Sequence, residues 1–115
     1  MDTIKNAKIL GIYIGEADTL KGQPLYEKII LLAKENHLAG ATAVKGILGF
    51  GENSRLHSAK ILDLSEDLPV IVEIVDEDEK IRNFLPILNQ LIEEANIGAT
   101  VTLRDVEIIR HSASK

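Results

Sequence analysis

Two segments of the chain carry apolar residues on both sides of an extended backbone, and this constrains the fold more than any other feature. Residues 8–14 read KILGIYI, and residues 70–75 read VIVEIV. β-Branched and aromatic residues favour strands, and a strand that is apolar on both faces is typical of the covered centre of a sheet. In the first segment one side carries Leu10, Ile12 and Ile14, and the other carries Ile9 and Tyr13.

Segments with helical spacing of apolar residues alternate with the predicted strands. The predicted elements are a strand at 8–14, a helix that opens at 22–24 and ends near 36–38, strands at 41–50 and 70–75, a helix from 76–79 onward and a strand at 101–110. Asp76 is the expected N-cap of the second helix, because Glu79 follows three residues later. Pro86 lies inside the apolar stripe of that helix and is expected to kink it.

The resulting order, β-α-β-β-α-β, predicts an α+β fold in a single domain that spans residues 1–115. Its simplest form is a ferredoxin-like antiparallel sheet with two helices on one face. The opposite face would then expose apolar side chains in a patch of the size that usually marks an interface. These side chains are Ile9, Tyr13, Ile71 and Val75. Self-association is therefore predicted from the alternation of side chains between the two faces of these strands alone.

Composition excludes several classes of function. The net charge is −5, and the chain has no Trp, two Tyr and two Phe, so it lacks the basic face and stacking platforms of nucleic-acid binders. The absence of cysteine excludes disulfides and thiolate metal sites and agrees with a reducing cytoplasm. No signal-peptide pattern and no apolar run of membrane-spanning length occurs, and we expect a cytoplasmic protein.

A glycine-rich segment and the long connection after it are the strongest candidates for a binding site. Gly46 and Gly49 suggest a bulge or the close approach of another group to the backbone. Residues 51–69 have no convincing period, and connections of this length are often functional. Backbone N–H groups here could cradle an anion, and Arg55, His57 and Lys60 could neutralise it. The alternative is a flexible surface hairpin loop with a glycine bulge.

Other polar residues give weaker indications. The acidic run 76–79 is better explained by helix capping than by a metal site, and the histidines lack ligand spacing. Glu73, on an apolar strand, needs a partner or an interface cavity, and structural pairing is the favoured interpretation. Arg104 and Arg110 could reach an anion at a subunit boundary, or they could be solvated or paired. No catalytic residue is indicated, because no nucleophile elbow, Ser/His/Asp group or carboxylate pair is present.

Several strings of the chain together resemble a known family. The sequence is similar to small, functionally uncharacterised bacterial and archaeal proteins grouped with the nitrogen-regulatory PII superfamily, and the resemblance covers residues 8–110. The strings are LGIYIGE at 10–16, GQPLYEKII at 22–30, AGATAVKGILGFG at 39–51, SRLHSAKILDLSEDLPVIVEIVD at 54–76 and EKI at 79–81.

The resemblance implies a ferredoxin-like subunit, a homotrimer formed through the sheets, and a segment at 51–69 equivalent to the PII T-loop. It also implies an adenine nucleotide, such as AMP, ADP or ATP, or a cyclic dinucleotide, between neighbouring subunits, with no covalent cofactor. The positions that match the family's nucleotide site are Gly46, Gly49, Phe50, Gly51, Gly98, Thr100, Thr102 and Arg110, with Arg55 and His57 in the T-loop equivalent.

The function that follows is a non-enzymatic PII-like regulator. Nucleotide occupancy would order residues 51–65, which would then engage or release a target protein that could itself be membrane-associated. The glutamine, the uridylylated tyrosine and the lysine-rich segment of classical PII proteins have no counterparts here, so nitrogen signalling and 2-oxoglutarate sensing are not implied. The alternatives are a trimeric protein of the divalent-cation tolerance type and a small enzyme that uses the same cleft.

Overall fold

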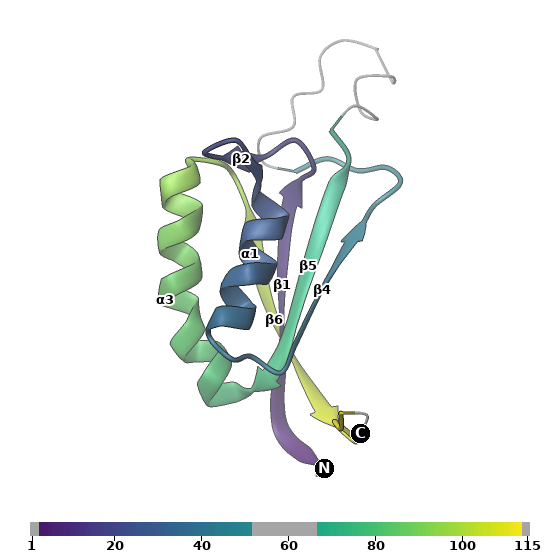
Figure 1. Cartoon of the computed structure of the whole chain (residues 1–115). Coiled ribbons are helices and arrows are strands. Elements are labelled where there is room, and N and C mark those ends of the chain that lie inside the picture. The colour runs from purple at the N-terminus through teal and green to yellow at the C-terminus, as the bar shows by residue number, and fades with distance from the viewer. Residues whose placement is uncertain (1–2, 52–66, 114–115) are drawn as a thin grey trace.

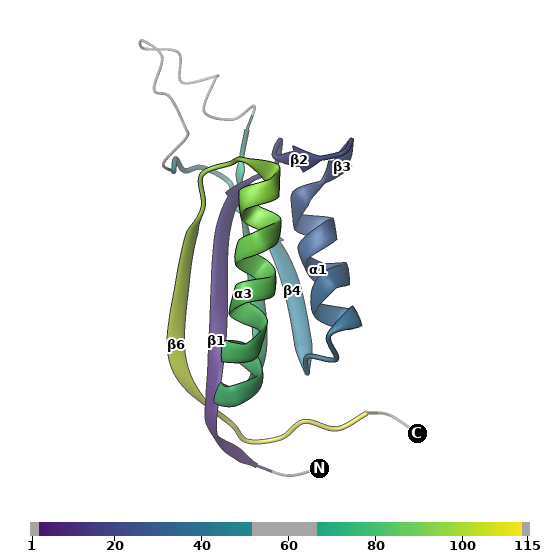
Figure 2. The same ribbon diagram turned by 90° about the vertical axis from the view of Figure 1, so that its left-hand side faces the viewer.

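The computed structural model describes residues 3–51 and 67–113, and it has the predicted ferredoxin-like architecture. Two helices pack on one face of a four-stranded antiparallel sheet with the order β4-β5-β1-β6 (Figures 1 and 2). The elements are β1 (Ile4–Gly15), β2 (Thr19–Leu20), β3 (Gln23–Pro24), α1 (Leu25–Glu35), β4 (Gly40–Lys45), β5 (Pro69–Glu77), α3 (Asp78–Ala95) and β6 (Thr100–Ile108). None of the helices in this part of the chain has the length and apolarity that a membrane crossing requires.

The hydrophobic core lies between the helices and the central strands β1 and β5. Alternate residues of these strands are buried against the apolar stripes of α1 and α3, as the alternation predicts. The core residues are Leu10, Ile12, Ile14, Leu25, Ile29, Ala33, Val70, Val72, Ile74, Ile81, Phe84 and Leu88. The helix α3 runs from Asp78 to Ala95 with Pro86 inside it.

The face of the sheet opposite the helices carries the apolar side chains that were expected there. We call this surface the outer face and define it by Ile9, Tyr13, Val44, Ile71 and Val75. The pair Glu73–Arg104 lies within it, with 2.8 Å between Arg104 Nη2 and Glu73 Oε2. This ion pair confirms the structural role predicted for Glu73. It reaches across β1, which lies between β5 and β6 in the sheet.

The strand predicted at 41–50 is shorter than expected. β4 ends at Lys45, which pairs with Val70, and Gly46 then donates a final hydrogen bond to the Pro69 carbonyl. Proline has no N–H to offer, so the ladder stops where β5 begins. Residues 46–51 form a loop along this end of the sheet. Of the long connection predicted at 51–69, the structure describes residues 51 and 67–69, and residues 52–66 lie outside the described part of the chain.

Asp76 is not the N-cap of α3, contrary to the capping prediction. The helix is preceded by Glu77, and no side chain caps it. Asp76 is instead buried at the end of β5, where Oδ2 accepts the Ala39 N–H at 2.9 Å and Oδ1 accepts the Glu77 N–H at 2.7 Å. The carboxylate therefore ties the chain entering β4 to the end of β5.

Candidate functional site

A cavity of about 370 Å³ opens at the end of the sheet where β1 ends and β5 and β6 begin. Its walls come from the end of β1 and the turn after it, the loop after β4, the start of β5 and the start of β6. The lining residues are Tyr13, Ile14, Gly15, Asp18, Gly49, Phe50, Gly51, Asp67, Pro69, Gly98, Thr100 and Thr102. Segments far apart in the sequence thus meet at one site.

Six of the predicted nucleotide-site residues line this cavity together. They are Gly49, Phe50, Gly51, Gly98, Thr100 and Thr102. The structure brings the two predicted regions, the loop after β4 and the start of β6, to the same place, although some 50 residues separate them in the sequence. Arg55 and His57 lie outside the described residues.

Gly46 has a packing role beside the cavity. A Cβ atom at Gly46 would lie 2.7 Å from Pro69 Cγ, and one at Gly49 would lie 3.0 Å from the same atom. Both glycines therefore permit the loop to lie directly on the first residue of β5. This confirms the prediction that another group approaches the backbone here, and the group is Pro69.

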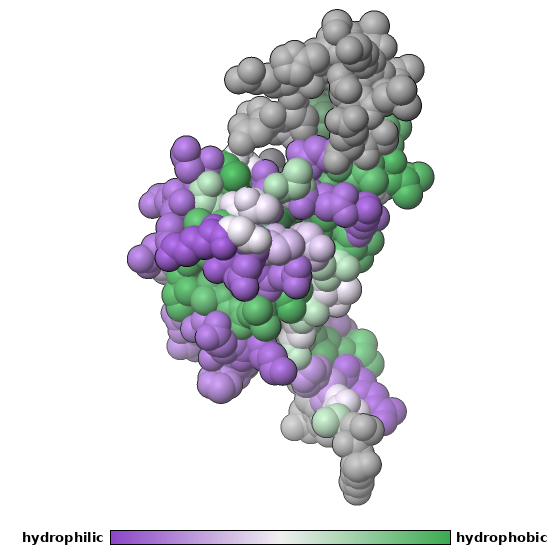
Figure 3. Space-filling model, turned by 45° about the horizontal axis from the view of Figure 1, so that its top comes forward, coloured by the Kyte–Doolittle hydropathy of each residue, from purple (hydrophilic) through white to green (hydrophobic). Residues whose placement is uncertain are grey.

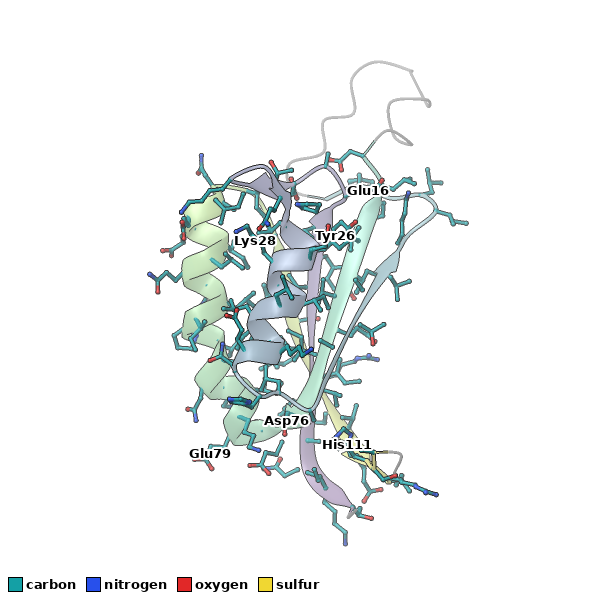
Figure 4. All side chains as sticks on the ribbon, in the orientation of Figure 1. Glu16, Tyr26, Lys28, Asp76, Glu79 and His111 are labelled. Atoms are coloured by element: carbon teal, nitrogen blue, oxygen red, sulfur yellow. The ribbon has the colours of Figure 1, made fainter. Side chains whose placement is uncertain are left out.

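Arg110 lies at the other end of the molecule. It follows β6, whose first residue Thr100 pairs with Tyr13 at the cavity and whose last residue Ile108 pairs with Ile4. Figure 4 shows the neighbouring residue His111 at the end of the sheet opposite Glu16. Within one chain Arg110 cannot reach the cavity, so its predicted role requires a neighbouring copy. Its Nε atom donates to Ser112 Oγ at 3.3 Å.

Two carboxylates at the cavity were missed by the sequence interpretation. Asp18 Oδ2 accepts the Gly15 N–H at 2.7 Å, which closes the turn after β1. Asp67 Oδ1 accepts the Ala17 N–H at 2.9 Å and so joins two segments 50 residues apart. The spacing of Asp18 from Gly15 is a local turn signal that could have been noticed, whereas nothing local in the sequence indicates the contact of Asp67.

The described walls of the cavity are acidic. No Lys, Arg or His from residues 3–51 or 67–113 lines it, while Asp18 and Asp67 do. Burial raises the pKa of Asp18, the Gly15 N–H lowers it, and the negative charge of Asp67 raises it further. The two carboxylates are therefore close enough to interact, and any anion placed beside them would be repelled.

Aromatic side chains are concentrated at the cavity. The chain has two Tyr and two Phe, and one of each lines this site. Tyr13 is 43% exposed and Phe50 is 71% exposed, although aromatic rings usually lose most of their surface in a packed domain. Exposed rings at a cavity offer a flat ligand a surface on which to stack.

An apolar surface continues outward from the cavity along the loop after β4. Figure 3 shows hydrophobic surface at the right-hand edge of the molecule, beside β4 and this loop. Val44, Ile47 and Leu48 are all more than half exposed there. Among the residues that the structure describes, no group of three or more His, Cys, Asp or Glu side chains could hold a metal ion.

A protein-family profile matches residues 7–108, nearly the whole chain. It is DUF190, described as "Uncharacterized ACR, COG1993". The chain belongs to this family. A "UPF0166 protein" of Aquifex aeolicus is 37% identical over 102 residues, which cover 89% of this chain and 92% of that protein. A "UPF0166 protein" of Methanocaldococcus jannaschii is 41% identical over 87 residues, which cover 76% and 80% of the two chains.

PII-like proteins are among the solved structures with the same fold. CPII of Thiomonas intermedia, a nitrogen regulatory PII-like protein bound to ADP, AMP and bicarbonate, has a TM-score of 0.62 and 18% identity, with 90% of this chain and 89% of CPII covered. A protein of Thermus thermophilus, named for its likeness to PII signaling proteins, has a TM-score of 0.58 and 20% identity, with 95% and 94% covered. The DUF190 chain therefore has a PII-like fold, as its sequence resemblance implied. The names of these relatives and neighbours describe no enzyme.

Proposed function

We propose that this DUF190 protein is a PII-like regulator that assembles as a homotrimer, binds an adenine nucleotide at the cavity and signals occupancy to a target protein through the segment that follows Gly51. The observation that carries the proposal is the position of the cavity. Its walls include residues at both ends of that segment: Gly49, Phe50 and Gly51 on one side, and Asp67 and Pro69 on the other.

Assembly through the outer face is supported by its chemistry. The sheet buries one face under the helices and leaves apolar side chains on the other, of which Tyr13 and Val44 are 43% and 53% exposed. A second and third copy would cover this surface. Tyr13 belongs both to the outer face and to the cavity, so a neighbouring copy would lie beside the cavity and could complete it.

Binding of an adenine nucleotide is supported by the exposed aromatics and by the fold. Tyr13 and Phe50 offer flat surfaces for a base, and Thr100 and Thr102 add hydroxyl groups at the start of β6. CPII, which shares the fold, was crystallised with ADP and AMP. A cavity of about 370 Å³ falls within the usual size range of small-molecule pockets.

The proposed signalling rests on how residues 52–66 are connected to the cavity. A ligand in the cavity would contact the loop before residue 52 and, after residue 66, Asp67 and Pro69. These contacts differ between the free and bound states. Leu68 also accepts the Glu16 N–H at 2.8 Å, which fixes the return of the segment to the end of β1. Ligand binding would thus bias the conformations open to residues 52–66 and change how a target protein is bound.

Calorimetric titration of the full chain with AMP, ADP, ATP and a cyclic dinucleotide tests the proposal, together with sedimentation for the oligomeric state. Phe50→Ala is expected to weaken adenine-nucleotide binding by roughly 10-fold, because stacking on an aromatic side chain contributes on the order of 1–3 kcal/mol per base. Ile47→Ala is the matched control. It lies in the same loop, is 93% exposed and does not line the cavity, so its affinity should equal that of the wild type.

Three outcomes would contradict the proposal. A monomer in sedimentation would contradict assembly through the outer face. A thermal response to copper or zinc with no response to any adenine nucleotide would favour a protein of the divalent-cation tolerance type. Steady conversion of a bound nucleotide to product would favour a small enzyme at the same cavity.

A further inference from the structure

The two carboxylates of the cavity restrict which part of a nucleotide can occupy it. From their geometry we infer that Asp18 and Asp67 bind the uncharged, hydrogen-donating end of the ligand, the ribose hydroxyls or the amino group of the base, and that they exclude its phosphates from their side of the cavity. This inference rests on the proposed function and assigns the orientation of the nucleotide within it.

One oxygen of each carboxylate accepts a backbone N–H group, and the other oxygen remains available to accept a hydrogen bond from a ligand. Asp18 uses Oδ2 for the Gly15 N–H, and Asp67 uses Oδ1 for the Ala17 N–H. The second oxygen of each has no hydrogen bond to any residue in the described ranges 3–51 and 67–113. A carboxylate oxygen only accepts, so its natural ligands are hydroxyl and amino donors.

Asp67 is placed tightly against the end of β1. A Cβ atom at Gly15 would lie 2.6 Å from Asp67 Oδ1 and 2.8 Å from Oδ2. The side chain therefore lies directly over the glycine backbone, and together with its bond to Ala17 this fixes it at the cavity wall. A fixed acceptor discriminates between ligands better than a mobile surface carboxylate, because less freedom is lost on binding.

Charge decides the orientation of the ligand. Phosphate groups beside Asp18 and Asp67 would meet two negative charges, and no described cation of the same chain lines the cavity to offset them. A ribose diol is instead stabilised beside the two carboxylates, because its hydroxyls donate to carboxylates in short charge-assisted hydrogen bonds. The phosphates are then directed away from the turn after β1, toward Thr100 and Thr102 on the edge strand β6.

The test asks whether removing the charge of each carboxylate weakens or strengthens nucleotide binding. Asp18→Asn and Asp67→Asn keep the oxygen that accepts the backbone N–H but remove the charge, so both should fold, which thermal unfolding verifies. Each is expected to bind adenosine and AMP roughly 10-fold more weakly than the wild type, as loss of a charge-assisted hydrogen bond implies. The matched control, Glu79→Gln, makes the same charge change at the opposite end of the molecule (Figure 4) and should leave affinity unchanged.

Ligand analogues test the same orientation without a variant. The wild-type chain is expected to bind 2′,3′-dideoxyadenosine more weakly than adenosine if the ribose is the donor, and purine riboside more weakly if the amino group is. Loss of affinity for neither analogue would overturn the inference.

The outcomes separate the inference from the proposed function. If the wild type binds AMP and the Asp→Asn variants bind it equally well or more tightly, the carboxylates do not hold the nucleoside end, and only the inference fails. If the wild type binds no adenine nucleotide, the proposed function fails and the inference fails with it.

Discussion

The buried carboxylate of Asp76 should contribute measurably to stability. Only 3% of Asp76 is exposed, and its two oxygens accept the N–H groups of Ala39 and Glu77 at 2.9 and 2.7 Å. Asp76→Ala removes both acceptors and leaves two backbone donors without them. A hydrogen bond to a charged group contributes about 1.5–3 kcal/mol. Since water can partly replace the acceptor at Glu77, which is partly exposed, we expect a total loss of about 3 kcal/mol.

Asp76→Asn should have about half this effect. The amide keeps one acceptor oxygen but turns an N–H₂ group toward the second backbone donor, so about 1.5 kcal/mol should be lost. For a domain of this size, 1 kcal/mol corresponds to a change in Tm of about 4 °C, so the expected decreases are about 12 °C for Ala and about 6 °C for Asn.

Urea unfolding and thermal unfolding at one fixed protein concentration measure both values, because assembly would make the stability depend on concentration. Glu79→Gln, an exposed acid in the first turn of α3, is the control and should change stability by no more than about 0.5 kcal/mol. If Asp76→Ala were no more destabilising than this control, the two hydrogen bonds would not have the role assigned to them.

Three further predictions concern the outer face and the cavity. Val75→Arg on the outer face should reduce the sedimentation mass to that of one chain, whereas Leu31→Arg on the exposed surface of α1, 55% exposed, should not. Burial raises the pKa of Asp18 above its ordinary value of 3.8, so the folded state binds the proton more tightly and stability falls as pH rises from 3.8 through the raised value. Asp18→Asn should therefore be more stable than the wild type at neutral pH in urea unfolding, and the difference should vanish below 3.8. Gly15→Ala should displace the Asp67 carboxylate, because the new Cβ would lie 2.6 Å from its oxygen, and calorimetry should show weaker nucleotide binding without loss of the fold.

Local patterns were sufficient to predict the central strands and both helices. Residues 8–14 and 70–75 are rich in β-branched residues, and the stripe of α3 repeats at helical spacing, so each element is specified by its own residues. The ends of the elements were predicted less accurately than the elements themselves. β4 stops at Lys45 because its partner strand begins with a proline, which is a property of the neighbouring strand.

The role of Asp76 shows a different limit of sequence interpretation. An acid three residues before Glu79 fits the capping pattern, but the register of β5 carries the strand on through Glu77 and turns Asp76 toward Ala39. The competing interaction comes from a residue 37 positions away, and a local pattern contains no information about it.

Sequence patterns alone predicted the β-α-β-β-α-β order and the strands that are apolar on both faces. The family resemblance implied the PII-like fold and the regions that meet at the cavity. Three features depended instead on tertiary contacts: Asp18 and Asp67 line that cavity, Gly46 and Gly49 lie on Pro69, and Arg110 lies at the far end of the subunit. The difference lies in the range of the interactions involved. Periodicity and turn chemistry act over a few residues, whereas the cavity is formed by strand ends that the antiparallel register brings together from distant parts of the chain.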